Sequence, residues 1–570
     1  MASLRIPLAG AVWTQSKDSA IFCKCGGRGI SGKSNVSFDP LPRRRVSGVN
    51  EQRRRGKLGQ GSVSVSWRES VQSPAVDRRN SSVCSSSRKD VWSAAKAVAV
   101  KGPETAPAVE GEQKIEYDWR TEWYPLYLTD EVPKDAPLAL NVYDHNLVLF
   151  YDGDGKLNCL EDQCPHRAAK LSDGQIMDGN LECLYHGWQF KGDGSCAKIP
   201  QLPAGAVIPK TACARSYAIR ESQDVVWVWM ADKTTADESK LPYFENYARE
   251  GFSHVSTIHE FPYDHSILVE NVLDPAHIHI AHDRTDFSAK REKAEALSFE
   301  VTERNERGFA GYVKPASAEE PFLYRFQAPS IVRNDKIYQD KDGKIQCASA
   351  CFLVRPTGQG KCTIIIRFGG TNLNTGMIPK WLIHMVGAKV FDQDVIFLAA
   401  QNETLIRNGV PTENVYLNIR SSDTMVVEYR KWLDKVGHGL PYYFGHKTVH
   451  SSPVAAAVER APAGPEAHAV STQPSKGAFG HMYARDPTNR YFKHVVHCKS
   501  CRSALNNFRQ SQKVSLVLAV LSTAVAITLS STKWRTILVA LALVLGAVSC
   551  ASSRGVDYMT QNFIRPKRQF

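Results

Sequence analysis

Four residues in two short loops have the types and spacing of iron–sulfur ligands. Cys164 and His166 form a C-x-H pattern, and Cys183 and His186 form a C-x-x-H pattern after sixteen intervening residues. The two thiolates could hold one iron of a [2Fe–2S] cluster and the two imidazoles the other, an arrangement that raises the cluster potential. A Cys2His2 zinc site is the alternative, but zinc fingers usually pair Cys with Cys and His with His, whereas each loop here supplies one of each. We therefore expect a [2Fe–2S] cluster that accepts and passes on single electrons.

A second, largely apolar stretch contains three histidines, His277, His279 and His282. Residues five positions apart lie about 140° apart on a regular helix, so His277 and His282 reach one metal ion only if the backbone wraps around it. His279, three positions before His282, is the competing ligand. Two imidazoles and one carboxylate form the facial triad of non-haem Fe(II) sites, which leaves coordination positions open for O2 and a substrate. The stretch therefore predicts two of the three ligands of a mononuclear iron.

The third ligand must come from elsewhere, and Asp392 and Asp394 are the two choices. At about 100° per residue along a helix, Asp394 shares an apolar face, whereas Asp392 lies on the opposite side with Lys389 and Glu403. An acid on an apolar face is costly unless it is paired or bound to a metal. We expect Asp394 to be the ligand and Asp392 to be a solvated charge; a salt-bridged core acid is the alternative for Asp394.

Two folded domains must position these residues. Short strands separated by Gly and Asp turns indicate a small antiparallel β domain over residues 118–230, including a hairpin over 138–152 that turns at 144–146. Residues 255–445 mix strands with helical stretches, among them a helix from Pro379 to about Arg407. The expected fold class is α+β.

The charge of the chain is concentrated near its start. The net charge is +13, and residues 1–90 hold seventeen basic residues against six acidic ones, together with seventeen serines. This composition is typical of a cleaved chloroplast or mitochondrial transit peptide, and a basic arm that stays attached is the alternative. The folded body between this leader and the basic C-terminal tail is nearly neutral, which argues against nucleic-acid binding.

The C-terminal region predicts a membrane hairpin. A linker rich in Pro, Ala, Gly and Ser spans about residues 451–490 and leads to a segment at 491–513. Residues 514–553 then contain two uncharged stretches, separated by Lys533-Trp534-Arg535, each near the lower length limit for crossing a bilayer. Two buried helices or a re-entrant pair are the alternative.

Cys498 and Cys501 form a single C-x-x-C motif just before the first uncharged stretch. A redox pair addressed by a thioredoxin is one interpretation. The alternatives are half a zinc site completed by His494 and His497, or two unpaired thiols beside the membrane.

The two sets of iron ligands together carry a family resemblance. Rieske loops followed by N-x-x-D-x-x-H-x-x-x-x-H, from Asn271 to His282, resemble the α subunit of a Rieske non-haem iron oxygenase over residues 118–445. The resemblance implies a START-like, helix-grip catalytic domain and a homotrimer that places one subunit's cluster beside the next subunit's iron. It further implies that Asp274 bridges a Rieske histidine and an iron-ligand histidine across that interface, and that Asn271 lies near the iron.

The segment 486–501, followed by the hairpin, is similar to the plant pheophorbide a oxygenase group. Its members include a translocon subunit of the chloroplast inner envelope and the protochlorophyllide-dependent translocon component, which the stretch 283–292 resembles most. The resemblance implies a tetrapyrrole substrate such as protochlorophyllide, chlorophyllide or pheophorbide, O2, electrons from reduced ferredoxin, and a location at the inner envelope or thylakoid membrane.

The leading hypothesis is thus a ferredoxin-dependent oxygenase of the chloroplast membrane that oxidises a chlorophyll-type macrocycle. A redox-sensing electron-transfer subunit of the inner-envelope protein-import translocon, with a vestigial iron site, is the second hypothesis. A soluble choline-type monooxygenase is the third, and it conflicts with the hairpin and the C-x-x-C motif.

Overall fold

The computed structural model describes residues 115–285, 289–340, 343–371, 378–450 and 489–561. The expected transit peptide lies outside these residues, as does all but the last two positions of the expected linker.

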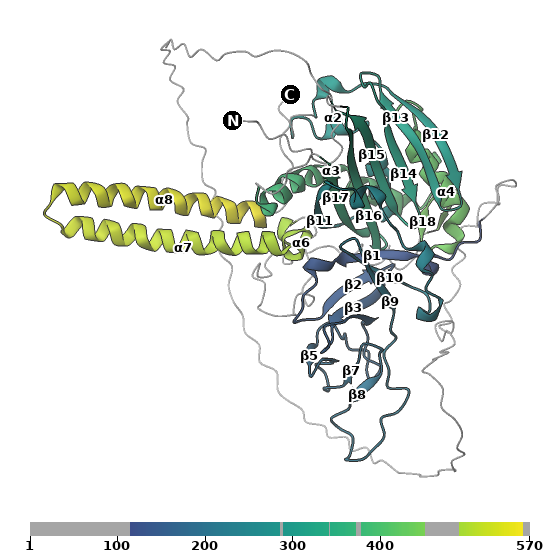
Figure 1. Ribbon diagram of the computed structural model, residues 1–570, viewed down its shortest axis with the longest axis horizontal. Helices are drawn as coiled ribbons and strands as arrows, with labels where there is room; N and C mark the ends of the chain where they lie inside the picture. Colours follow the sequence, from purple (N-terminus) through teal and green to yellow (C-terminus); the bar gives the residue numbers. More distant parts are fainter. Residues whose placement is uncertain (1–114, 286–288, 341–342, 372–377, 451–488, 562–570) are drawn as a thin grey trace, which may run out of the picture. The chain divides into compact units, whose positions relative to one another are not determined.

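The first folded part, residues 115–230, consists of short antiparallel strands in three sheets, as the sequence predicts (Figure 1). Their orders are β1-β10-β9, β2-β3-β4 and β5-β6-β7-β8. The strands are β1 (Trp123–Leu128), β2 (Leu138–Val142), β3 (His145–Tyr151), β4 (Leu157–Glu161), β5 (Gln175–Met177), β6 (Asn180–Glu182), β7 (Gln189–Phe190), β8 (Cys196–Lys198), β9 (Ala218–Ser222) and β10 (Val225–Trp229).

The predicted hairpin at 138–152 is confirmed, but its turn lies one position earlier than expected. Val142 pairs with His145, so the turn consists of Tyr143 and Asp144, whose φ angles are 47° and 65°. Two successive positive φ values belong to the type I′ turn, whose twist matches that of the flanking strands. His145 is therefore the first residue of β3.

The second folded part contains a seven-stranded antiparallel sheet in the order β11-β17-β16-β15-β14-β13-β12. Its strands are β11 (Ser253–Phe261), β12 (Leu297–Asn305), β13 (Gly308–Pro315), β14 (Phe322–Gln327), β15 (Ile331–Gln339), β16 (Ile345–Gly358) and β17 (Lys361–Gly370). A two-stranded ribbon of β18 (Tyr443–Phe444) and β19 (Val449–His450) follows later in the chain.

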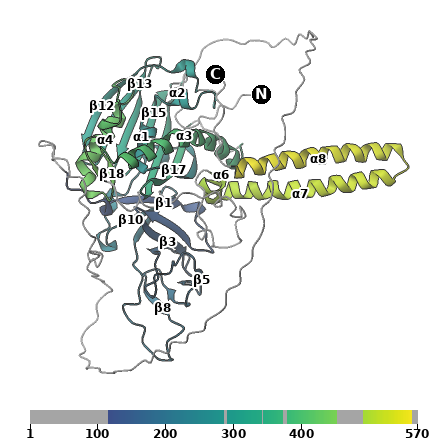
Figure 2. The same ribbon diagram turned by 180° about the vertical axis from the view of Figure 1, so that it is seen from behind.

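Helices α1, α3 and α4 lie together on one side of this sheet (Figure 2), an arrangement in which helices grip a curved sheet. The helices of this part are α1 (His265–Leu273), α2 (Ile278–Ala281), α3 (Lys380–Asn408) and α4 (Thr424–Val436). The predicted helix at 379–407 is confirmed as α3. It begins directly after Pro379 and ends at Asn408, and the next residue, Gly409, has a φ of 58°, the left-handed conformation common just past a helix end.

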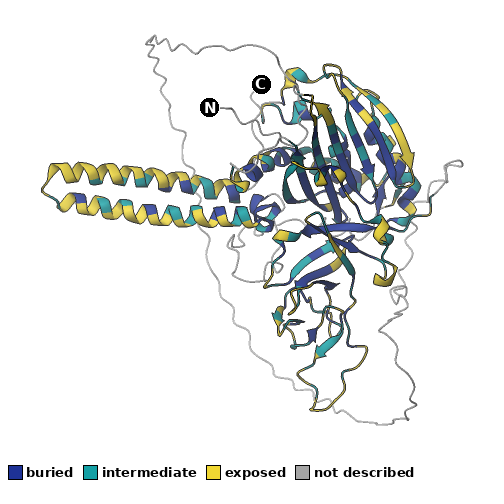
Figure 3. Cartoon of the chain, viewed as in Figure 1, coloured by how far each residue is buried: buried dark blue, intermediate teal, exposed yellow. Residues whose placement is uncertain are grey.

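The C-terminal part contains α6 (Arg490–Lys493), a 3-10 turn (Val495–His497), α7 (Lys499–Thr528) and α8 (Thr532–Thr560). Helices α7 and α8 run side by side, and each is long and apolar enough to cross a membrane. Their side chains are mostly exposed (Figure 3), unlike those of helices in a protein core. Lys533 and Arg535, which separate the two uncharged stretches in the sequence, lie in the first turn of α8, and the connection between the helices is at 529–531.

Candidate functional site

The two loops that carry the predicted cluster ligands have the same backbone hydrogen bonds. In each loop the cysteine carbonyl accepts a hydrogen bond of 2.9 Å from the backbone N–H of the residue four positions later. This residue is Ala168 after Cys164 and Gly187 after Cys183. These two residues have positive φ angles of 56° and 72°. In each loop the cysteine N–H also donates, at 2.8 Å, to the carbonyl five positions on. Two matching tight turns thus present one Cys–His pair each.

The cysteines and histidines of these loops occupy different environments. Cys164 and Cys183 are buried, and a hydrogen bond from Cys164 is the largest cause that lowers the pKa of Cys183 to about 6. His166 is exposed, and its ring centroid lies 4.5 Å from that of half-buried His186. Trp188 stacks on His166 at 4.7 Å. A buried thiol pair and an outer imidazole pair fit a two-iron cluster ligated by cysteine at one end and by histidine at the other.

A single helical turn brings His277 and His282 together. His277 is the N-cap of the four-residue α2, and His282 is its C-cap, with φ −105° and ψ 22°. Because the backbone leaves the helical conformation at His282, the two rings approach to 5.3 Å between centroids. This is the wrapping of the backbone that a spacing of five residues requires for a shared metal.

Helix α3 supplies the carboxylate predicted to complete this group. Asp394 Oδ1 lies 3.3 Å from His282 Nε2, and the ligand atoms of Asp394, His277 and His282 all lie within 4.8 Å of one another. The Asp394 side chain is buried, which raises its pKa despite the two imidazoles, and its Oδ1 has no hydrogen-bond partner among the described residues. A buried carboxylate oxygen that faces two imidazoles and lacks a donor fits a bound cation.

A glutamine that the sequence analysis missed orients one of these rings. Gln393 Oε1 lies 2.9 Å from His282 Nδ1 and accepts its proton, which leaves the Nε2 lone pair facing Asp394. Gln393 is itself held by Thr285 Oγ1 at 2.7 and 2.9 Å. Such outer hydrogen bonds fix the tautomer and the ring orientation of metal-binding histidines. The position of Gln393 directly before Asp394 was the only feature of the sequence that could have indicated this role.

Asp274 and Asn271 both lie close to the His277 ring. Asp274 Oδ2 lies 3.4 Å from His277 Nδ1, and its Oδ1 accepts from the Ala276 N–H at 2.7 Å. Burial alone would lower the pKa of His277, but its hydrogen bond to Asp274 and the charge of that residue outweigh burial and raise it. Asn271 Nδ2 lies 3.3 Å from His277 Nε2. His279 points elsewhere, since its Nδ1 accepts from the Lys290 N–H at 3.4 Å.

The expectation of a solvated Asp392 was wrong. Its side chain is buried and accepts from Arg490 Nε at 3.2 Å and Nη2 at 2.5 Å, and it also contacts Lys493 Nζ. The opposite face of α3 is therefore covered by α6, and Asp392 holds that C-terminal segment in place.

The two cysteines of the C-x-x-C motif are buried free thiols. His494, one of the two histidines that sequence alone offered as zinc ligands, lies beside them, with Nε2 3.4 Å from Cys501 Sγ. The other, His497, points away, toward Tyr127 Oη at 3.0 Å and Glu260 Oε1 at 3.1 Å. A residue that the sequence did not suggest, His384 of α3, takes its place.

Two family models match the chain. The Rieske [2Fe-2S] domain matches residues 122–217, and pheophorbide a oxygenase matches residues 326–411. The first range contains both cysteine–histidine loops, and the second ends just after α3 and includes Asp394. A Rieske domain implies a [2Fe–2S] cluster, and Rieske oxygenases use a mononuclear non-haem iron.

Curated relatives extend the match over most of the chain. Protein TIC 55, chloroplastic, of Pisum sativum is 50% identical over 86% of this chain and 92% of its own length. Pheophorbide a oxygenase, chloroplastic, of Arabidopsis thaliana is 28% identical over 80% and 84%, respectively. The Protochlorophyllide-dependent translocon component 52, chloroplastic, of the same plant is 25% identical over 68% and 74%.

The expected group is confirmed, and within it the identity to Protein TIC 55 is twice that to the translocon component that the stretch 283–292 suggested. These relatives are chloroplast proteins, and so is this chain. The chain belongs to the pheophorbide a oxygenase group of Rieske non-haem iron oxygenases, and within that group it resembles Protein TIC 55.

Proposed function

We propose that this chain oxidises a chlorophyll-type tetrapyrrole with O2 and electrons from reduced ferredoxin, at the inner-envelope membrane of the chloroplast. The observation that carries the proposal is the convergence of His277, His282 and Asp394, whose ligand atoms lie within 4.8 Å of one another in a buried site. A chain that only passed electrons on would not need these three donors, which leave coordination positions of a bound iron for O2 and a substrate.

The roles of the residues follow from their contacts. In this proposal His277, His282 and Asp394 hold Fe(II), and Cys164, Cys183, His166 and His186 hold the [2Fe–2S] cluster. When bound, the [2Fe–2S] cluster supplies single electrons and the Fe(II) activates O2. Gln393 keeps the His282 proton on Nδ1, and the Asp274 carboxylate faces His277 Nδ1 at 3.4 Å. The apolar ring of Phe397 lies 6.5 Å, centroid to centroid, from that of His277.

A homotrimer is the second part of the proposal. Within one chain, Asp274 contacts only one of the two imidazoles that it is proposed to connect, His277. Its side chain remains 25% exposed, so one carboxylate edge can be reached from outside the chain. A Rieske histidine of a neighbouring copy, exposed as His166 is here, would complete the bridge.

Substrate and location rest on the relatives and on the C-terminal helices. The names of two relatives refer to pheophorbide a and to protochlorophyllide, both chlorophyll-type macrocycles. Helices α7 and α8 would insert as a hairpin and hold the site near a membrane in which apolar pigments dissolve.

The deciding experiment uses the full chain in detergent or lipid nanodiscs, loaded with iron and sulfide. It is incubated with O2, reduced ferredoxin and, in separate reactions, pheophorbide, chlorophyllide, protochlorophyllide, a linear bilin and a flavonoid as a macrocycle-free control. We expect an oxygenated product from one macrocycle, with 18O incorporated from 18O2. Turnover of the flavonoid alone, or of no compound, would refute the proposed substrate class.

A redox-sensing subunit of a protein-import complex is the competing function. It predicts that the Rieske cluster is reduced by ferredoxin and reoxidised without any substrate product. The same reactions therefore separate the two functions, since ferredoxin oxidation without product formation favours the sensor.

A further inference from the structure

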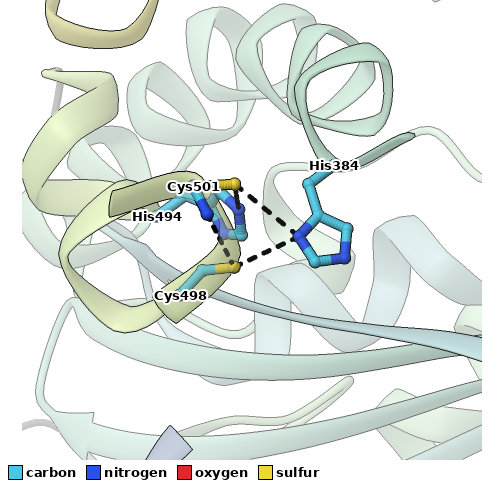
Figure 4. A group of neighbouring side chains, drawn as sticks. All are labelled: His384, His494, Cys498 and Cys501. Carbon is cyan, nitrogen blue, oxygen red and sulfur yellow. Dashed lines mark hydrogen bonds between the residues drawn. The ribbon is translucent and has the colours of Figure 1, made fainter. Parts of the chain in front are cut away.

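Four buried side chains outside the oxygenase site meet where α3 and α7 approach each other. His384 comes from α3, His494 follows α6, Cys498 caps α7 and Cys501 lies in its first turn (Figure 4). Their ligand atoms all lie within 4.8 Å of one another, and none of the four side chains reaches the surface. The described residues contain only one other such group, the oxygenase triad.

The separations match the edges of a tetrahedron around one metal ion. His384 Nδ1 lies 3.3 Å from Cys498 Sγ and 3.7 Å from Cys501 Sγ, and His494 Nε2 lies 3.4 Å from Cys501 Sγ. A tetrahedral zinc ion, with bonds of about 2.3 Å to sulfur and about 2.0 Å to nitrogen, places sulfur and nitrogen ligands roughly 3.5 Å apart. The three measured sulfur–nitrogen separations lie within about 0.3 Å of that value.

Outer contacts prepare two of the four donors for a metal. His494 Nδ1 lies 2.7 Å from the Ile258 carbonyl, which can only accept, so the proton is on Nδ1 and the Nε2 lone pair faces Cys501. This is the backbone contact that usually orients a metal-binding histidine. Cys498 Sγ accepts from the Cys501 N–H at 3.5 Å, at the N-terminus of a thirty-residue helix, where negative charge on sulfur is stabilised.

The charge balance selects the ion. Two thiolates and two neutral imidazoles carry a charge of −2, which a divalent cation cancels, so the loaded site is neutral and can be buried. The mixed sulfur and nitrogen set with tetrahedral separations is typical of zinc, and four protein ligands leave no position for a substrate. We propose that His384, His494, Cys498 and Cys501 bind a structural Zn2+ ion that fastens the start of α7 to the helix carrying Asp394.

A small apolar core surrounds the site and indicates what the ion stabilises. Met385 of α3 packs with Val495, Leu505 and Met559 from the C-terminal part. This core is much smaller than the main one, so a covalently coordinated ion contributes a large share of its stability. The zinc thereby joins the apolar hairpin to the catalytic part of the chain.

The test counts metals in the full-length protein, purified anaerobically in detergent and incubated with Zn2+. We expect about one zinc per chain in addition to the iron, and zinc K-edge absorption with two sulfur ligands at about 2.3 Å and two nitrogen ligands at about 2.0 Å. The oxygenase triad contains no sulfur, so zinc misplaced in the iron site would show only nitrogen and oxygen. An unfilled Rieske site, Cys164, His166, Cys183 and His186, would give zinc the same two sulfur and two nitrogen ligands, so the spectrum is recorded on protein whose Rieske cluster is fully occupied by its iron and sulfide content. A zinc shell without sulfur, or no bound zinc at all, would overturn the proposal.

Variants assign the ligands. Cys498→Ser/Cys501→Ser and His384→Asn should each lose the zinc while the electron paramagnetic resonance signal of the Rieske cluster is retained. His497→Asn is the matched control, since His497 is adjacent to Cys498 yet faces Tyr127, and it should retain zinc. Zinc retained by the double cysteine variant, or a Cys498–Cys501 disulfide in wild-type protein kept anaerobic, would contradict the site. If a variant does not fold, the absorption spectrum of wild-type protein with a fully occupied Rieske cluster decides, because the filled cluster leaves no zinc position at Cys164 and Cys183.

Discussion

Helix α3 contributes to two buried donor clusters that differ in the number and softness of their donors. Asp394 completes a set of three with His277 and His282, and His384 completes a set of four with His494 and the C-x-x-C cysteines. Asp394 lies ten positions after His384 on the helix, which is about 15 Å along the axis. Three donors without sulfur leave coordination positions for reactants, whereas four donors, two of them soft thiolates, complete the coordination shell. One helix can thus carry a site for oxidation and a second site that attaches the C-terminal helices to the catalytic part of the chain.

The largest effect expected is the loss of oxidation in Asp394→Ala. Removal of the only carboxylate of the triad leaves two imidazoles, and we expect tetrapyrrole oxidation to fall more than about 100-fold. The Rieske signal and the zinc content should not change, and both are measured in the same sample. Glu403→Ala, an exposed acid on the same helix, is the control. Oxidation at the wild-type rate in Asp394→Ala would remove this residue from the iron site.

The next largest effect concerns the other face of α3. Asp392→Asn leaves two buried cations, Arg490 and Lys493, without a charged partner, and breaking a buried ion pair costs about 3–5 kcal/mol. We expect the denaturant midpoint at which the C-terminal part detaches to fall, together with zinc occupancy, while iron occupancy is retained. Loss of iron before zinc would mean that Asp392 supports the oxygenase site instead.

A smaller effect is expected when a positioning residue of the triad is changed. Gln393→Leu removes the acceptor for His282 Nδ1, which should weaken iron binding or lower the oxidation rate about 10- to 100-fold. Gln393→Glu keeps an oxygen acceptor and should restore most of the iron affinity. Gln401→Leu serves as the control. Gln401 lies further along α3, and this change removes only its hydrogen bonds away from His282, chiefly the one to Tyr416 Oη. Equal iron affinities in Gln393→Leu and wild type would show that the contact does not orient His282.

The smallest effect sharpens the contrast between the two clusters. Because sites more than about 7–10 Å apart usually act independently, Cys498→Ser/Cys501→Ser should lower oxidation by less than about tenfold. Amide hydrogen exchange should nevertheless increase at residues 490–505, where the zinc is proposed to hold the chain. Unchanged exchange in this segment, or a loss of oxidation as large as in Asp394→Ala, would contradict the division of roles.

The sequence predicted the oxygenase site better than the C-terminal site, and the two aspartates of α3 show why. Periodicity placed Asp394 on the apolar face correctly, because that face packs on the body of the same domain. The same periodicity assigned Asp392 to solvent, since a helical wheel does not show that α6, about one hundred residues later, covers the opposite face. Amphipathicity identifies one buried face and says nothing about a second.

The histidines give the same lesson. His277 and His282 lie in one short stretch, so both could be named as candidate ligands from the sequence, although only the structure separates them from His279. His384 has no such signal in Trp381-Leu382-Ile383-His384-Met385, and His497 has a misleading one beside Cys498. Only the fold shows that His497 turns toward Tyr127 and that His384 reaches the cysteines.

By itself, the sequence determined the two Cys–His loops, the paired histidines, the α3 carboxylate and the two apolar C-terminal helices, because a few covalent bonds or one helical period limit where those residues can lie. The tertiary structure alone decided which distant side chains meet: Gln393 with His282, Asp392 with Arg490, and His384 with Cys498. Chain connectivity does not select such partners, since loop closure costs little more for one long separation than for another. Packing of α3 against the rest of the chain makes that selection.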